Sequence, residues 1–476
     1  MAAGQRKKDG GRRATSVLLA SCLLSSSCFL LVARAQTATT NISYEDVKAI
    51  VDVLRDDLLP AELRTNTTAG REALWPDWAS RRDAAIRARL ARADEDSLLN
   101  LLLLGTTFTR HPRVTELASL RAADAAARMA GGRADDLVGA LAASSGDERM
   151  RFAREVIAGA GIAVETPTGR RQAREYLFAI LARVTRETEE FARTVAAMSR
   201  LDDPVAKLAL DATIYRDRGL SPDTSIVPSF GIERALSDLR TVGRLGPNSV
   251  RRVAIVGPGL DLVDKREGYD FYPVQTIQPF AVVDSLARLG LSSTNDLRVT
   301  TFDVSPRVNG HLEAARRRAA GGSGYLVHLP LGPQQPWTAE LRSYWSRFGD
   351  SIGEEALPAT LPPAAGVQVR ALRVRPDTVQ SIVPRALNIV LQRLSLLPPA
   401  ERFDLVIATN VLIYYDVFEQ SLALANIATM LRPGGLLLSN TLVAELPQLP
   451  MALVAHTDIV YTETGVGDRI LCYERR

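Results

Sequence analysis

The chain has 476 residues, of which 46% are hydrophobic, and its mean hydropathy is near zero. This composition supports a folded core and excludes wholesale disorder, and the length predicts about two or three domains. The formal net charge is +4, and part of the excess comes from basic residues among the first 13 positions. The remainder is close to neutral, so the charge does not favour a nucleic-acid-binding protein.

The first 35 residues have the pattern of a signal peptide or a membrane anchor. A basic head precedes an apolar run over residues 16–32, which ends in Ala33-Arg34-Ala35. This pattern predicts export with cleavage after Ala35. Two alternatives are a lipobox ending at Cys22 and an uncleaved anchor that associates with the membrane. A start codon placed too far upstream is the remaining alternative, and it leaves a cytoplasmic protein.

The chain has few cysteines and histidines for disulfide formation or zinc binding. Two of the three cysteines, Cys22 and Cys28, lie in the predicted export segment, so Cys472 has no intramolecular partner after cleavage. The four histidines show no H-x-x-x-H spacing, and no C-x-x-C is present. We therefore expect no zinc site.

Residues 36–218 have the pattern of an all-α domain. Ser43 is placed as the N-cap of a first helix, with Asp46 three residues later. Apolar spacing predicts further helices at 81–104, 113–130, 135–143, 147–160, 168–199 and 203–216. Glycine, serine and proline predict turns at 131–132, 144–146 and 166–169. We expect Trp75 and Trp78 to pack in a core or between domains.

Residues 219–249 are predicted to form a linker with a lead-in helix. After them the hydrophobic period changes, and from residue 250 to 476 buried strands alternate with helices. This alternation predicts a Rossmann-like, doubly wound α/β fold with a mostly parallel seven-stranded sheet. The predicted strands are 251–257, 297–304, 367–374, 403–409 and 434–441. A closing pair at 457–463 and 468–474 is separated by a short glycine turn, which predicts an antiparallel C-terminal hairpin.

A glycine turn follows the first strand of this region. The apolar residues 253–256 lead into Gly257 and Gly259, where the missing side chains let the backbone approach a ligand closely. The phosphate-binding fingerprint requires a third glycine, and Leu262 stands at that position. Its absence argues against NAD and FAD, although an NAD(P)-dependent oxidoreductase remains a hypothesis.

Polar residues follow two further predicted strands. Asp303 ends the second strand, where a carboxylate can accept hydrogen bonds from both ribose hydroxyls of a nucleoside. The alternative is a charge at the N-terminus of the next helix. Asn410 follows the strand at 403–409, and its amide suits the ammonium and carboxylate of an amino-acid-bearing cofactor. Tyr414 and Tyr415 either line an acceptor pocket or pack in the core.

The glycine loop, Phe-Asp-Leu-Val at 403–406 and Leu-Arg-Pro-Gly-Gly at 431–435 together resemble the class I S-adenosylmethionine-dependent methyltransferases over roughly residues 250–476. More narrowly, Asn-Val-Leu-Ile-Tyr-Tyr-Asp at 410–416 is similar to a motif of the CheR-type chemotaxis-receptor glutamate methyltransferases, and Gln-Pro-Phe at 278–280 has a partial counterpart there. The resemblance implies S-adenosylmethionine as cofactor. It places the predicted cofactor contacts at Gly257, Pro258, Gly259, Asp261, Asp303, Asn410 and Val411.

The chain departs from the chemotaxis enzymes at Thr409, where those enzymes carry Arg. The methyl acceptor, a small molecule or a protein, is therefore not identified by the resemblance. Methyl transfer depends mainly on alignment, and only a hydroxyl or amine acceptor needs a base. Tyr272, Tyr414 and Asp416 are the candidate catalytic residues.

A non-catalytic function is the main competing hypothesis. An exported protein finds little S-adenosylmethionine outside the cytoplasm, so the methyltransferase-like fold would then serve as a binding or scaffold module.

Overall fold

The structure is a computed structural model that describes residues 38–64, 67–114, 123–143, 146–263, 269–362, 366–395 and 397–476. The predicted export segment, residues 1–35, lies outside these residues. Residues 38–476 form one compact unit. Among the described helices, none combines the length and the apolar character that a membrane span requires.

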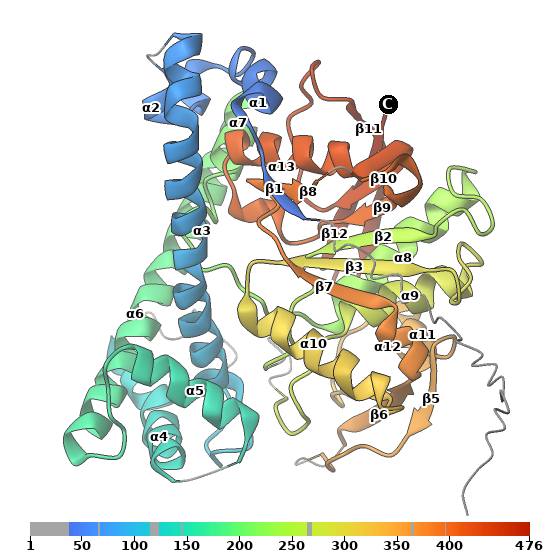
Figure 1. Cartoon of the computed structure of the whole chain (residues 1–476). Helices are drawn as coiled ribbons and strands as arrows, with labels where there is room; N and C mark the ends of the chain where they lie inside the picture. Colours follow the sequence, from blue (N-terminus) through green and yellow to red (C-terminus); the bar gives the residue numbers. More distant parts are fainter. Residues whose placement is uncertain are drawn as a thin grey trace, which may run out of the picture. The chain divides into compact units, whose positions relative to one another are not determined.

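A seven-stranded sheet forms the centre of this unit (Figure 1). Its strands are β2 (Arg252–Val256), β3 (Arg298–Asp303), β7 (Ile382–Ala386), β9 (Phe403–Ile407), β10 (Leu431–Ser439), β11 (Met451–Val460) and β12 (Gly467–Arg475). The order across the sheet is β11-β12-β10-β9-β2-β3-β7. Neighbours from β10 to β7 are parallel, and β12 is antiparallel to β10 and β11. The predicted mostly parallel sheet and its antiparallel C-terminal hairpin are both confirmed.

The strand order reverses between β2 and β9. From β2 the chain adds β3 and β7 on one side, and it then returns to add β9 and β10 on the other. In open parallel sheets, ligands bind outside the carboxyl ends of the strands at such a reversal. The fold therefore directs attention to the loops that follow β2, β3 and β9.

The predicted strand at 367–374 belongs to a different sheet. Here β6 (Gln368–Val374) pairs antiparallel with β4 (Tyr325–Leu331) and β5 (Gly353–Ala356). The place beside β3 is taken by β7, which was not predicted. Pro384 within β7 is compatible with an edge strand only, and proline weakens the sequence pattern of a strand. Assigning 367–374 to the main sheet was therefore wrong.

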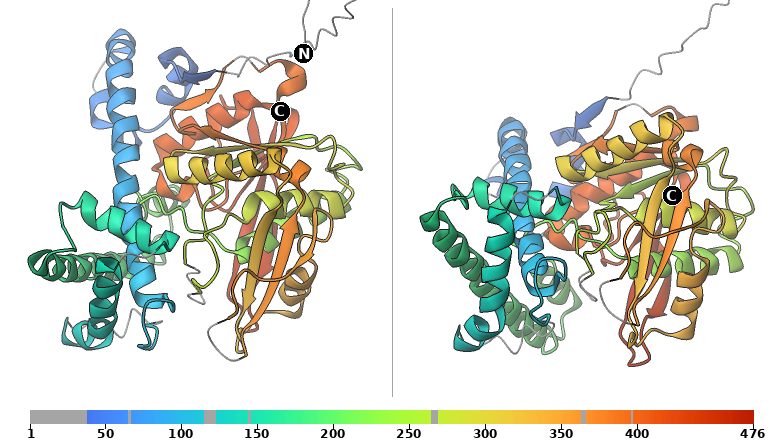
Figure 2. Two further views of the ribbon diagram at one scale, coloured as in Figure 1. Left: turned by 60° about the horizontal axis from the view of Figure 1, so that its bottom comes forward. Right: turned by 90° about the horizontal axis from the view of Figure 1, so that it is seen from below.

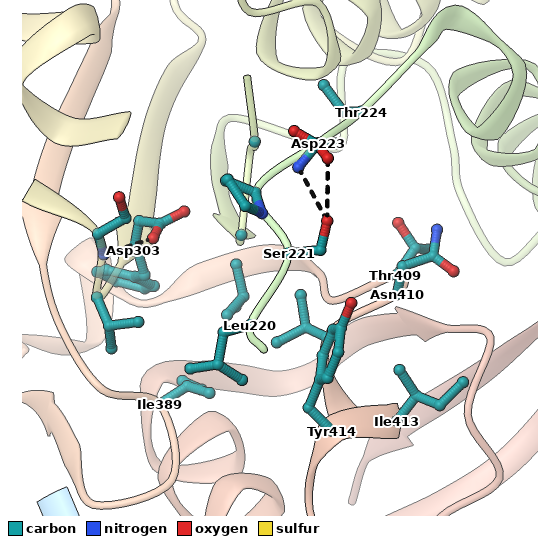
Figure 3. Close-up of a pocket in the computed structure, with 18 of the residues that line it drawn as sticks. Leu220, Ser221, Asp223, Thr224, Asp303, Ile389, Thr409, Asn410, Ile413 and Tyr414 are labelled. Atoms are coloured by element: carbon teal, nitrogen blue, oxygen red, sulfur yellow. Dashed lines mark hydrogen bonds between the residues drawn. The ribbon is translucent and has the colours of Figure 1, made fainter. Parts of the chain in front are cut away.

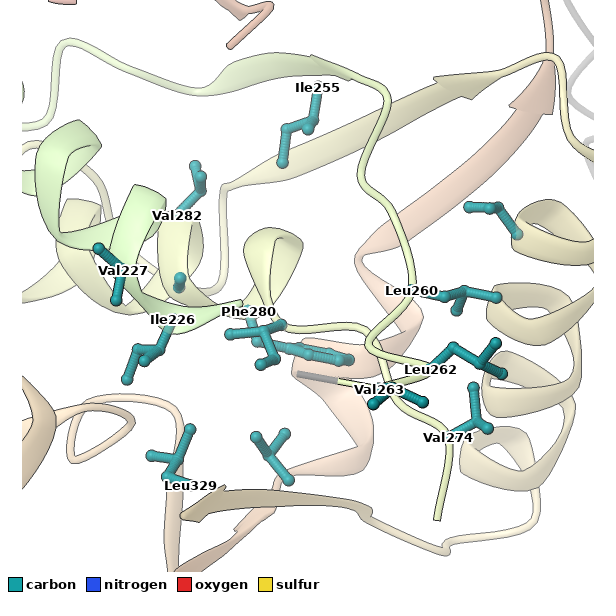
Figure 4. Packing of buried hydrophobic residues seen from close by; sticks show 14 of the residues in the cluster. Ile226, Val227, Ile255, Leu260, Leu262, Val263, Val274, Phe280, Val282 and Leu329 are labelled. Carbon is teal, nitrogen blue, oxygen red and sulfur yellow. The ribbon is translucent and has the colours of Figure 1, made fainter. Parts of the chain in front are cut away.

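Helices cover both faces of the seven-stranded sheet. Side chains alternate between the faces along each strand, so Val253 and Ile255 belong to one buried cluster, whereas Ala254 and Val256 belong to another. Figure 4 shows Ile255 in the first cluster, near Val282 of a covering helix. The first cluster includes residues of the helices α8 (Ile226–Thr241), α9 (Gln278–Arg288) and α10 (Pro306–Ala320). The second cluster includes residues of the helices α1 (Tyr44–Val51) and α13 (Val417–Met430).

The N-terminal part is helical, as predicted, and its helices α3 to α6 remain grouped in both views of Figure 2. The helices are α2 (Ala61–Arg64), α3 (Thr68–Leu104), α4 (Ala123–Ala142), α5 (Glu148–Gly159), α6 (Pro167–Met198) and α7 (Pro204–Asp211). Gly131 and Gly132 lie inside α4, so the turn predicted there was wrong. A Cβ on Gly132 would lie 2.5 Å from Nε2 of His111, so this glycine permits close packing.

The N-terminal residues are tied to the sheet region. The predicted capping box is confirmed, because Asp46 accepts from the Ser43 backbone N–H at 2.9 Å while its own N–H donates to Ser43. Trp75 and Trp78 are buried and their rings contact Phe418 of α13. This confirms their predicted packing role. Strand β1 (Thr39–Asn41) pairs with β8 (Gln392–Leu394) and adds a second connection.

Candidate cofactor site

A cavity of about 350 Å³ lies at the carboxyl ends of β2, β3 and β9 (Figure 3). Its walls include Gly257 and Gly259 after β2, and residues 302–305 at the end of β3. Residues 409–411 and 413–415 after β9 form another wall, and the linker residues 220–225 complete it. The cavity therefore occupies the position that the strand reversal indicates.

The two loop glycines accommodate other parts of the protein. Gly257 and Gly259 have φ angles of +66° and +71°, which disfavour any residue with a side chain. A Cβ on Gly259 would lie 2.5 Å from the carbonyl oxygen of Pro222, and one on Gly257 would lie 2.7 Å from Cγ2 of Val411. The Leu260 N–H donates to the Pro222 carbonyl at 2.6 Å. The glycines thus let the linker and the β9 loop close around the cavity.

Asp303 lies at the end of β3 and lines the cavity. One carboxylate oxygen accepts from the Ser305 backbone N–H at 2.7 Å. Burial raises the pKa of Asp303 to about 7, against the lowering effect of backbone hydrogen bonds. The N-cap of α10 is Ser305 rather than Asp303. The carboxylate is therefore placed to meet a ligand in the cavity.

Asn410 lines the cavity in a left-handed backbone conformation, with φ of +59°. Its N–H donates to Oδ1 of Asn440 at 2.7 Å, and the Asn440 amide nitrogen donates back to its Oδ1 at the same distance. Asn440 also donates to Asp468 at 3.1 Å. Asn440 was not predicted as a site residue, although it lies directly after β10, where a polar side chain indicates a site.

Gln278 is a further wall residue, and it was not predicted individually as a site residue. It is the first residue of α9 and is 4% exposed. Its amide nitrogen donates to the Thr409 hydroxyl at 3.1 Å, whereas its Oε1 is buried without a hydrogen-bond partner. A buried amide oxygen without a donor is unfavourable, so Gln278 offers an acceptor to a ligand in the cavity.

Four of the predicted site residues are not among those that line the cavity: Pro258, Asp261, Tyr272 and Asp416. The Tyr272 hydroxyl donates to Asp261 at 2.9 Å, in a buried position where its ring stacks on His328. Asp416 is the N-cap of α13 and accepts from the Glu419 N–H at 3.0 Å. Burial raises its pKa to about 6. Val411 and Tyr414 do line the cavity.

The helical part supplies a wall of the cavity through Leu90 of α3 and Tyr215. Arg89, beside Leu90, donates to the backbone carbonyls of Tyr215, Arg218 and Tyr414 at 2.8 to 3.0 Å. The rings of Tyr215 and Tyr414 meet edge to face with centroids 5.9 Å apart. Helix α3 thus fixes both tyrosines at the cavity.

The cavity has an acidic character. Asp223 and Asp303 line it, and the described residues of its wall include no lysine, arginine or histidine. Nowhere in the described part of the chain do three or more His, Cys, Asp or Glu side chains gather as a metal site would require. A ligand with a net positive charge is therefore favoured over an anionic one.

No family model matches the chain, and no curated protein matches it in sequence. Among the similar solved structures is the N-methyltransferase NodS of Bradyrhizobium japonicum WM9 in complex with S-adenosyl-L-homocysteine. Its sequence is 14% identical, the match covers 56% of this chain and 98% of that chain, and the TM-score is 0.26. The magnesium protoporphyrin IX methyltransferase of Synechocystis PCC 6803 with bound SAM has 14% identity over 56% of this chain and 97% of that chain, with a TM-score of 0.27. The mitomycin 7-O-methyltransferase MmcR has 14% identity over 86% of this chain and 100% of that chain, with a TM-score of 0.28.

Proposed function

We propose that the protein binds S-adenosylmethionine in this cavity and transfers its methyl group to an acceptor. The observation that carries the proposal is the meeting of Gly257, Asp303 and Asn410 around one cavity at the strand reversal. These residues come from the ends of three different strands, and a nucleoside that carries an amino acid needs contacts of all three kinds. The resemblance of residues 403–406, 410–416 and 431–435 to methyltransferase motifs supports the same cofactor.

The residues present fit this cofactor. Asp303 would accept hydrogen bonds from the ribose hydroxyls, and the unpartnered Oε1 of Gln278 would accept from the ammonium group. Asn410 would face the amino-acid carboxylate. The apolar side chains of Leu387 and Ile389, which also line the cavity, suit the adenine ring.

The bound cofactor supplies an electrophilic methyl group on a positively charged sulfur. The residues of this chain would orient the two reactants and exclude water, with Leu90 and Tyr215 closing the cavity from the helical part. The cavity carries two carboxylates and, among its described wall residues, no basic side chain, which suits a sulfonium ion. The pyrophosphate of NAD(P) would meet repulsion there, which disfavours the oxidoreductase alternative.

Isothermal titration calorimetry of the full chain tests the proposal, with S-adenosylmethionine and NADH as separate titrants. We expect S-adenosylmethionine to bind and NADH not to bind. Asp303→Ala should weaken S-adenosylmethionine binding by about 1–3 kcal/mol because charged hydrogen bonds are lost. Asp202→Ala, at an exposed position of the helical part, is the matched control and should leave the affinity unchanged.

Two results would contradict the proposal. A folded protein that binds neither titrant would favour the non-catalytic scaffold. NADH binding in place of S-adenosylmethionine would favour the oxidoreductase.

A further inference from the structure

We propose that Asn440 is a positioning residue, which orients the side-chain amide of Asn410 so that the site selects ligands with a carboxylate group. This inference rests on the proposed function and deepens it, because it concerns how the amino-acid end of the cofactor is recognised. Asp468 holds Asn440 in turn. Neither Asn440 nor Asp468 is among the described residues that line the cavity, so both act through Asn410.

Three neighbouring strands bring these residues together. In the sheet, β10 lies between β9 and β12, parallel to β9 and antiparallel to β12. The carboxyl ends of β9 and β10 therefore meet the start of β12 at one edge of the sheet. Asn440 directly follows β10, Asn410 lies in the loop after β9, and Asp468 is the second residue of β12. The side chain of Asn440 is thus within reach of both neighbours.

The hydrogen-bond roles in this group are fixed at both ends. The Asn410 backbone N–H can only donate, and it donates to Oδ1 of Asn440 at 2.7 Å. The Asp468 carboxylate can only accept, and it accepts from Nδ2 of Asn440 at 3.1 Å. One orientation of the Asn440 amide satisfies both contacts. In this orientation its nitrogen also meets the Asn410 side chain at 2.7 Å, so the atom there must be the acceptor Oδ1.

Asn410 consequently offers a donor to the cavity. Its Oδ1 accepts from Asn440, and no printed contact between described residues uses its amide nitrogen, which keeps both hydrogens for a ligand. Without the Asn440 contact the amide could turn over and present its oxygen instead. An amide nitrogen stabilises a carboxylate by a charge-assisted hydrogen bond, whereas an amide oxygen repels it. Asn440 thereby decides which end of the Asn410 amide a ligand meets.

A complementary amide lies at the same end of the cavity. The Gln278 nitrogen donates to the Thr409 hydroxyl at 3.1 Å, and its buried Oε1 has no hydrogen-bond partner among the described residues. Thr409 directly precedes Asn410, so a donor and an acceptor lie close together. An amino acid needs both, because its carboxylate accepts and its ammonium group donates. Figure 3 shows Asn410 across the cavity from Asp303, the residue that would bind the ribose.

Calorimetry on the full chain tests the inference with two probes. They are S-adenosyl-L-homocysteine and its decarboxylated analogue, which keeps the nucleoside and the ammonium group. The wild type should bind S-adenosyl-L-homocysteine at least about tenfold more tightly, as expected for one hydrogen bond to a charged group. Asn440→Ala should remove this preference by weakening S-adenosyl-L-homocysteine binding alone. Asn295→Ala, at an exposed position outside the cavity, should change neither affinity.

An exchange of the two side chains separates positioning from a merely structural role. In Asn440→Asp combined with Asp468→Asn, the carboxylate at position 440 accepts from the Asn410 N–H and from the amide at position 468. The links between the strands are therefore kept. The same carboxylate can only accept from the Asn410 side chain, so Asn410 should turn its nitrogen to position 440 and its oxygen to the cavity. We expect a urea midpoint close to that of the wild type, without the preference for the carboxylate-bearing probe.

The outcomes separate this inference from the proposed function. If S-adenosyl-L-homocysteine does not bind to the wild type, the proposed function fails and takes the inference with it. If the wild type binds both probes equally, or the variants retain its preference, the inference alone is overturned. Equal weakening of both probes in Asn440→Ala would assign Asn440 a structural role only and would also overturn it. If Asn440→Ala does not fold, the exchange variant decides by the same comparison.

Discussion

The guanidinium group of Arg89 donates to the backbone carbonyl of Tyr414 at 3.0 Å, which joins helix α3 to the loop that follows β9. The same side chain bonds the carbonyls of Tyr215 and Arg218. The helical part is therefore a component of the cavity wall. Its removal would leave the site open on one side.

Arg89→Met should destabilise the protein and widen the cavity. The substitution leaves three backbone carbonyls without their donor, so we expect a loss of about 2–4 kcal/mol in the free energy of unfolding. The affinity for S-adenosylmethionine should fall as well. Arg87→Met is the matched control. Among its described contacts, Arg87 forms an ion pair only with the partly exposed Asp83 one helical turn away, and the two side chains are 2.8 Å apart. This control should lower the free energy of unfolding by about 0.5 kcal/mol. Equal effects of the two variants in urea unfolding would contradict the role of Arg89.

Gly259→Ala should disturb the linker as well as the loop. The alanine would be strained at φ of +71°, and its Cβ would press on the Pro222 carbonyl. Gly290→Ala is the control, because φ is +66° there and no atom lies within 4 Å of the added Cβ. The control should cost about 1–2 kcal/mol through backbone strain alone. Gly259→Ala should cost about 1–3 kcal/mol more. Thermal unfolding measures both, and indistinguishable melting temperatures would show that the Pro222 contact is unimportant.

Cofactor binding should depend on pH through Asp303. Its pKa is raised to about 7 by burial, and the ionised carboxylate is the better acceptor for ribose hydroxyls. S-adenosylmethionine should therefore bind more tightly as the pH rises from 6 to about 8. Asp303→Asn should flatten this dependence, and calorimetry across the range measures it. A dependence that persists in the variant would assign it to another group.

The raised pKa of Asp303 also determines how the stability of the folded protein changes with pH. The pKa of Asp303 is higher in the folded protein than its ordinary value of 3.8, so the folded state holds the proton more tightly. This contribution to stability is fully present below the unfolded pKa and is lost as the pH rises through about 7. Asp416, with a pKa raised to about 6, acts in the same direction. The free energy of unfolding, measured against pH for the wild type and for Asp303→Asn, gives by difference the contribution of Asp303.

Export with cleavage after Ala35 is the prediction that competes with the proposed methyl transfer, because S-adenosylmethionine is scarce outside the cytoplasm. The described structure begins at Ala38, whose carbonyl accepts from the Ser395 N–H at 2.8 Å, and β1 starts at Thr39. Cleavage after Ala35 would therefore leave every described contact intact. Mass spectrometry of the protein from its native host should find Gln36 as the first residue. An intact or lipidated N-terminus would support the anchor or the lipobox instead.

The sequence alone determined the local features of this protein. The largely apolar runs that became β2 and β9 were predicted because buried parallel strands are almost continuously apolar. The capping box at Ser43 follows from side chains that reach only the neighbouring turn. Gly257, Asp303 and Asn410 were found together because each lies at or shortly after the carboxyl end of a predicted strand. Parallel strands bring their carboxyl ends to one edge, which made this part of the site predictable.

The tertiary structure decided what depends on contacts between distant residues. The strand pattern at 368–374 could not show that β6 pairs with β4 and β5, because hydrogen-bonding partners are not encoded in the alternation of one strand. The approach of Pro222 to Gly259 and the contact of Arg89 with Tyr414 join segments far apart in the chain. Tyr272 follows the glycine loop closely in sequence, yet its side chain is buried against Asp261 and His328. Local periodicity fixes which face of an element is buried, and only the packing of the elements decides which side chains share a cavity.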